Sequence, residues 1–169
     1  MSWSEPRSRR GVLAALAGLP ALGLAGCGFA LRQPPKLAFA SIALTGFAPR
    51  SPLATELQQR LAQRVRVLDT PDRADVVLQS LEDRRERSVV ATTSAAQVRE
   101  LQLRVRFTFR AHTPAGRDLI PRAELLVARD LSYAETVALA KEYEEAELFR
   151  EMQSDVVWQV LRRLAAIEL

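Results

Sequence analysis

The chain has 169 residues, of which 48% are apolar and 26% charged, and its formal net charge is +4. This composition is typical of a globular protein and excludes an intrinsically disordered chain. The length allows one domain with a hydrophobic core but not two ordinary domains. Of the 24 basic residues only Lys36 and Lys141 are lysines, so arginine dominates the basic side chains.

The N-terminus has the pattern of an export signal. Three arginines precede an apolar run, residues 11–26, and the run ends in Leu24-Ala25-Gly26-Cys27. The run is too short for a membrane span of about 20 residues, and small residues before a cleavage site are typical of signal peptides. Leucine three residues before a cysteine resembles a bacterial lipobox, in which the cysteine is acylated. We therefore predict a signal peptide over 1–26, cleavage between Gly26 and Cys27, and lipidation of Cys27; Sec and twin-arginine export both remain open.

Cleavage before Cys27 lowers the net charge of the chain, and this changes which binding partners the charge predicts. The predicted signal contains three arginines and one glutamate, so its loss lowers the formal net charge from +4 to +2. A nucleic-acid partner, which a high pI would otherwise indicate, is therefore not expected. Cys27 is the only cysteine, so no disulfide is expected once it carries lipid. Gly28 follows where an aspartate commonly marks inner-membrane retention, which points to the outer membrane.

The first part of the predicted mature chain contains a tether, a strand and a helix. Residues 27–35 are interpreted as a lipidated tether, because Pro34 and Pro35 oppose helix formation. The apolar, small residues 37–44 are typical of a buried strand. Ser51 and Pro52 are suited to the cap and the first position of a helix, which then places three leucines on one face. A short extended piece at 65–68 and a turn at 69–72 follow.

Three further strands are predicted, at 74–81, 101–110 and 119–133. The second is the clearest, because apolar residues from Leu101 to Phe109 alternate with polar ones. Such alternation buries one face and leaves the other in water or against a partner. The charged stretch 82–87 is expected at a strand end or in a loop.

The C-terminal part is predicted to be helical. Ser132 to Glu135 have the spacing of a capping box, and a long amphipathic helix is expected beyond Lys141. The order strand, helix, three strands, helix predicts an α+β fold: a two-layer sandwich whose four-stranded, mostly antiparallel sheet is covered on one face by two helices. This single domain is expected to span 36–169, with its first strand free to lie parallel to another.

The residue inventory predicts binding and not catalysis. His112 is the only histidine and has no serine or cysteine motif near it, so a structural role is expected. One histidine without a free thiol is a poor metal site. No glycine-rich phosphate loop is present, and neither an enzyme activity nor a cofactor is predicted.

Two arginine clusters are the candidate binding residues. Arg104 and Arg106 lie on the polar face of the clearest strand, about 7 Å apart, and Arg84, Arg85 and Arg87 form a second cluster. The planar guanidinium matches phosphate better than a lysine ammonium does. An ordinary solvated surface in an arginine-rich chain is the alternative interpretation.

Several motifs together resemble the LPS-assembly lipoprotein LptE family. The lipobox is followed by Cys27-Gly28-Phe29-Ala30-Leu31-Arg32, and the order of elements also agrees. The other matching motifs lie at 129–133, 138–142, 147–148, 152, 155 and 159–164. Ala30 and Leu131 depart from the residues that are frequent in the family, histidine and an aromatic, which leaves a divergent branch open.

The resemblance implies a lipoprotein anchored by Cys27 in the inner leaflet of the outer membrane. It would plug the lumen of the LptD β-barrel, assist the folding of that barrel, and help to place lipopolysaccharide in the outer leaflet. Arg84, Arg85 and Arg87, then Arg104 and Arg106, are the expected contacts with barrel or lipopolysaccharide. The alternative is a free-standing, periplasm-facing lipoprotein that binds lipid or peptidoglycan as an accessory to another transport system.

Overall fold

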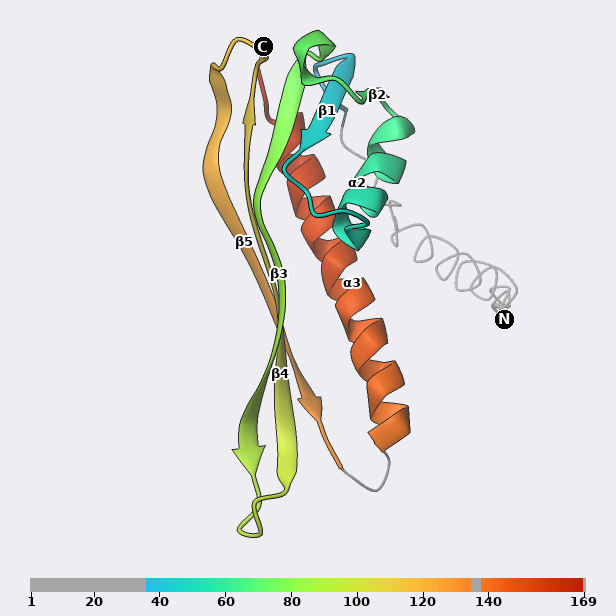
Figure 1. Cartoon of the computed structure of the whole chain (residues 1–169), viewed down its shortest axis with the longest axis vertical. Coiled ribbons are helices and arrows are strands. Elements are labelled where there is room, and N and C mark those ends of the chain that lie inside the picture. Colours follow the sequence, from blue (N-terminus) through green and yellow to red (C-terminus); the bar gives the residue numbers. More distant parts are fainter. Residues whose placement is uncertain (1–35, 135–137, 169) are drawn as a thin grey trace, which may run out of the picture. The chain divides into compact units, whose positions relative to one another are not determined.

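The computed structural model describes residues 36–134 and 138–168, which form a five-stranded sheet with two α-helices on one side of it (Figure 1). The predicted signal peptide, the tether, Gly26 and Cys27 lie outside the described residues, as does part of the predicted capping box. In chain order the elements are β1 (Ser41–Thr45), α2 (Pro52–Ala62), β2 (Arg66–Leu68), the 3₁₀ turn η2 (Pro71–Arg73), β3 (Val76–Thr92), β4 (Val98–His112), β5 (Asp118–Ser132) and α3 (Ala138–Ala165).

The sheet is mixed and its strand order is β2-β1-β3-β4-β5. β1 lies parallel to both β2 and β3, whereas β3, β4 and β5 form an antiparallel meander. The α+β class and the two helices are as predicted. The prediction of a four-stranded, mostly antiparallel sheet was wrong, because the sheet has five strands and is mixed. The expected extended piece at 65–68 pairs with β1 as a fifth strand, because α2 brings the chain back along that edge.

The start of α2 follows its sequence. Ser51 Oγ accepts a hydrogen bond from the Ala54 amide at 3.1 Å, and Pro52 occupies the first helical turn. The same hydroxyl donates to Asp83 Oδ2 on β3 at 2.8 Å. Leu53, Leu57 and Leu61 are buried on the face toward the sheet. The cap therefore both begins the helix and ties it to the sheet.

The chain passes close to β3 between β1 and α2. Gly46 adopts a φ of +75°, and a Cβ at this position would lie 2.3 Å from the carbonyl oxygen of Ser80. Only glycine tolerates both the left-handed conformation and this approach.

Asp75 fixes the beginning of β1. Its Oδ2 accepts hydrogen bonds from the Ser41 hydroxyl at 2.9 Å and from the amides of Ala40 and Ser41 at 3.0 and 2.8 Å. The Ser41 hydroxyl bond is the main cause that lowers the pKa of Asp75 below its ordinary value of 3.8. These donors stabilise the ionised carboxylate.

The core lies between the sheet and the helices. The alternation predicted for β4 is confirmed, since Leu101, Leu103, Val105, Phe107 and Phe109 are all buried. They pack against apolar side chains of α3, namely Met152, Val156, Val157, Val160, Leu161 and Leu164. Burial of each large aliphatic side chain contributes about 1.5–3 kcal/mol, so this face supplies most of the stability.

β3 is much longer than predicted. It continues from Val76 to Thr92 through the charged stretch 82–87, which was wrongly placed at a strand end or in a loop. Its backbone pairs with β4 almost throughout, with a register shift between Ser80 and Glu82. The backbone pairing stabilises a strand here even though its side chains are charged.

Candidate functional site

The five candidate arginines lie on β3 and β4 but not on one surface. Arg84 is opposite Arg106, whereas Arg85 is opposite the buried Val105 and Arg87 opposite the buried Leu103. Directly opposed residues of neighbouring strands have their side chains on the same face. Arg84, Arg104 and Arg106 therefore lie on the face away from the helices, and Arg85 and Arg87 on the face toward them.

We call the first surface the open face, because no described element covers it. It is polar and carries both charge signs, with two small or apolar residues on β5. Its members are Glu82, Arg84 and Glu86 of β3, Gln102, Arg104, Arg106 and Thr108 of β4, and Glu124, Leu126, Ala128 and Asp130 of β5.

The arginines of the open face contact neighbouring polar side chains. Arg84 Nε lies 3.3 Å from Glu86 Oε1, and Arg106 Nη1 contacts Glu124 Oε1. Arg104 Nε donates to Gln102 Oε1 at 2.7 Å, and Gln102 Nε2 donates to Asp130 Oδ1 at 3.0 Å. Exposed pairs of this kind contribute about 0–1 kcal/mol each, so a partner can exchange them.

Thr108 lies at the centre of the open face, between Glu82 of β3 and Glu124 of β5. Its side chain is fully buried, and its Oγ1 has no hydrogen-bond partner among the described residues. An unsatisfied buried hydroxyl costs about 1–3 kcal/mol. Sequence reasoning grouped this threonine with the wet positions and missed its burial.

The second surface is a groove between β3 and the N-terminal half of α3. The groove has a volume of about 730 Å³, and its lining carries both charge signs. The charged lining residues are Arg85, Arg87, Glu142, Glu145 and Arg150, and the others include Ala146, Phe149 and Gln153. Arg85 lies over the Phe149 ring at 5.7 Å and donates to Gln153 Oε1. Neither partner is charged, which leaves the Arg85 guanidinium without a carboxylate among the described residues.

Arg87 also lines a smaller space of about 340 Å³, which we call the apolar hollow because its other lining side chains are mostly apolar. Val89, Val98, Leu101 and Tyr133 line the hollow together with Arg87. Arg87 Nη1 lies 3.2 Å from Glu145 Oε2 of α3. The ion pair of Arg87 and Glu145 thus lies where the charged groove meets the apolar hollow.

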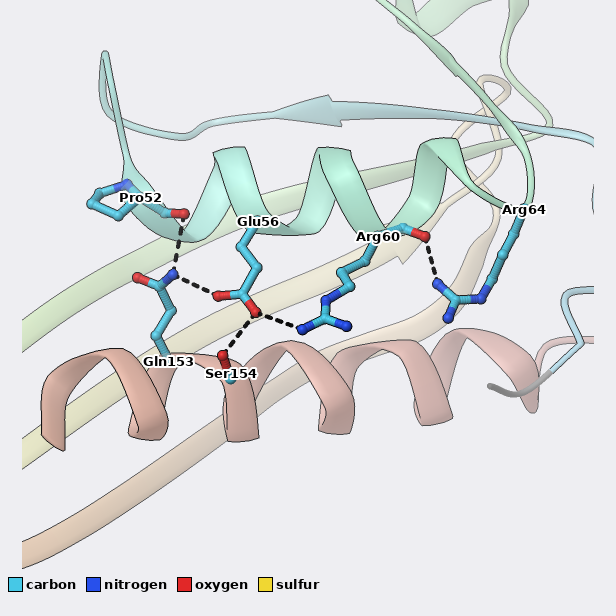
Figure 2. A network of polar contacts seen from close by, with 6 residues as sticks. All are labelled: Pro52, Glu56, Arg60, Arg64, Gln153 and Ser154. Carbon is cyan, nitrogen blue, oxygen red and sulfur yellow. Dashed lines mark hydrogen bonds and ion pairs between the residues drawn. The ribbon is translucent and has the colours of Figure 1, made fainter. Parts of the chain in front are cut away.

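A polar network fixes α2 to α3 (Figure 2), and a bond from Arg85 extends it to β3. Gln153 is 7% exposed, and its Nε2 donates to Glu56 Oε2 at 2.7 Å and to the Pro52 carbonyl at 3.3 Å. Ser154 Oγ donates to Glu56 Oε1 at 2.8 Å, and Arg60 Nη2 lies 3.6 Å from the same oxygen. With the bond from Arg85, this network joins three elements. Sequence reasoning missed it, because a glutamine within a charged helix gives no signal of burial.

The described residues contain no group of three metal-ligating side chains. His112 Nδ1 lies 2.8 Å from the Thr113 carbonyl oxygen, a local contact at the end of β4. Within the same part of the chain, no helix is both long and apolar enough to cross a membrane. The open face and the groove are the two surfaces that contain the candidate arginines.

Comparison with known proteins identifies the family. The model of the LptE family, described as lipopolysaccharide-assembly, matches residues 39–164. The chain belongs to the LptE family. It is 30% identical over 165 residues to the LPS-assembly lipoprotein LptE of Yersinia enterocolitica, a match that covers 94% of this chain and 78% of that protein. The resemblance seen in the sequence is confirmed.

Solved structures of lipoproteins share the fold. Lipoprotein B of Nitrosomonas europaea is 27% identical with a TM-score of 0.71, covering 82% of this chain and 91% of that chain. The rare lipoprotein B of Shewanella oneidensis is 23% identical with a TM-score of 0.64, covering 75% and 94%, and this likeness concerns the fold alone. Family and relatives together support an LPS-assembly lipoprotein.

Proposed function

We propose that this LptE-family protein is an outer-membrane lipoprotein that plugs the LptD β-barrel, assists its folding and takes part in lipopolysaccharide transport to the outer leaflet. The observation that carries the proposal is the family match over residues 39–164. The lipobox at Cys27 supports a lipid anchor, because two or three acyl chains hold a protein at a membrane almost permanently. The role is binding and not catalysis.

The open face is the surface that we assign to the barrel wall. A barrel lumen is polar, and the open face offers guanidinium, carboxylate and amide groups in exchangeable pairs. Leu126 is 51% exposed on the edge strand β5 and can pack against an apolar side chain of the wall. Arg84, Arg104 and Arg106 are accordingly barrel contacts.

Arg85 and Arg87 are the residues that we assign to lipopolysaccharide. Lipid A carries phosphates, and a guanidinium binds phosphate through charge-assisted, often bidentate hydrogen bonds. Arg85 itself has only the neutral Gln153 and Phe149 as partners, whereas Glu142 and Glu145 line the same groove, so an anion must bind at Arg85 and Arg87 in competition with these two carboxylates. The apolar hollow beside Arg87 is suited to the hydrocarbon part of the same molecule.

Photocrosslinking in cells tests the assignment of the open face. A photoreactive residue at Leu126 should capture one large, heat-modifiable outer-membrane protein. The matched control is Gln58, an exposed residue of α2 on the other side of the domain, which should capture the same protein far more weakly. Capture of nothing, or of many small proteins, at Leu126 would instead favour the free-standing lipoprotein.

A further inference from the structure

The two halves of α3 differ in how they are held. All of its buried residues lie at or after Met152, and Leu148 and Phe149 are only partly buried against the core. Before Leu148, the large apolar side chains are exposed, Leu139 by 68% and Tyr143 by 72%. Residues 138–147, which we call the lid, therefore have no described apolar side chain packed in the core.

Polar contacts join the lid to the sheet. Lys141 Nζ donates to Ser132 Oγ at 3.3 Å, and Glu145 pairs with Arg87 of β3. In the sequence, Glu145 lies one turn and Lys141 two turns before Phe149, so both are on the side of α3 that faces the sheet. Charged residues thus replace the apolar residues that continue the core after Met152.

The helix is firmly fixed directly after the lid. Gln153 and Ser154 hydrogen-bond to Glu56 of α2 (Figure 2). Gln153 also accepts a hydrogen bond from Arg85 of β3. In the domain, the start of α3 and the β3–β4 hairpin point toward the same end (Figure 1). The lid therefore continues into a fixed part of α3 after Phe149, and its residues Glu142, Glu145 and Ala146 line the groove.

We propose that residues 138–147 open and close as a unit over the groove while the rest of α3 stays in place. A ten-residue helix is marginal in water on its own, and each exposed ion pair contributes about 0–1 kcal/mol, so opening requires far less free energy than global unfolding. Opening breaks the ion pair between Arg87 and Glu145. The groove and the apolar hollow then become continuous, and the Arg87 guanidinium is released from its carboxylate. The Arg87 side chain is 57% exposed even with the lid in place, so opening does not uncover Arg87 but releases its guanidinium from Glu145 and widens the groove, whatever ligand the groove takes.

Hydrogen exchange of the full-length protein in detergent tests the lid. The amides of 142–147 should share one protection level and exchange at least about a hundredfold faster than those of 153–163. Amides 138–141 are omitted, because the first turn of any helix lacks intrahelical acceptors. Equal protection along all of α3, or a gradual rise from 142 to 152 as in simple fraying, would overturn the proposal.

Variants of the Arg87–Glu145 pair distinguish the lid from a passive helix end. Glu145→Ala should raise exchange in 142–147 by about two- to fivefold, because it removes one surface pair. The double variant R87L/E145L should slow it at least about tenfold, because it extends the apolar core beneath the lid. Glu147→Ala is the matched control, since Glu147 pairs with Arg150 within α3 and not with the sheet. An unchanged rate in R87L/E145L would contradict the proposal.

Discussion

Replacement of Gln153 by leucine tests the network that joins α2, α3 and β3. Gln153→Leu keeps the side-chain size but removes hydrogen bonds to Glu56, Arg85 and the Pro52 carbonyl. A hydrogen bond to a charged group contributes about 1.5–3 kcal/mol, and two of these bonds are of that kind. Because both charged partners keep access to water, we expect the free energy of unfolding to fall by about 2–3 kcal/mol.

Urea denaturation of the protein in detergent, followed by circular dichroism, measures this loss. Ser154→Ala removes one bond to Glu56 and should lower the free energy of unfolding by about 1 kcal/mol. Gln58→Leu is the control for the exchange of glutamine for leucine on an exposed helix surface, and it should change stability by less than about 0.5 kcal/mol.

A double-mutant cycle separates the network from simple packing. Gln153→Leu and Glu56→Ala should show a coupling free energy of about 1 kcal/mol, because their side chains hydrogen-bond directly. A loss below about 0.5 kcal/mol for Gln153→Leu, or additive effects in the cycle, would refute the reasoning that this network fixes α3 beside the groove.

Three further predictions concern single residues. Thr108→Val should raise the free energy of unfolding by about 1 kcal/mol in urea denaturation, because it removes a buried hydroxyl without a described partner; a loss would show that the hydroxyl is satisfied. Asp75→Asn should destabilise the domain at neutral pH. Since the pKa of Asp75 is lowered, the difference from wild type should be fully present above 3.8 and disappear as the pH falls through the lowered pKa; a pH-independent difference would contradict this. Gly46→Ala should cost more than about 2 kcal/mol in thermal unfolding, because φ is +75° and Ser80 O is 2.3 Å away; a neutral result would mean that β3 yields.

The elements with a strong periodic pattern could be predicted from the sequence. The alternation from Leu101 to Phe109 predicted which face of β4 is buried, and Ser51 with Pro52 predicted the start of α2. Both signals are local, because the side chains that make the pattern are those that make the contact. The same holds for the apolar face of α3 after Met152.

The positions of the arginines could not be predicted, because they depend on pairing between strands. The charged stretch 82–87 has no apolar alternation, yet β4 supplies backbone partners along it. The register shift near Leu81 then decides which arginines face the helices, and a bulge of one residue reverses that choice. The expected cluster of Arg84, Arg85 and Arg87 is thereby divided between two surfaces.

The central claim is a lipid-anchored protein held in a barrel, and native mass spectrometry of the complex extracted from membranes tests it most directly. The account predicts a one-to-one assembly with a large β-barrel protein, in which this chain begins at Cys27 and carries the mass of attached acyl chains. A chain that is recovered alone, with an unmodified N-terminus at Cys27, would contradict it.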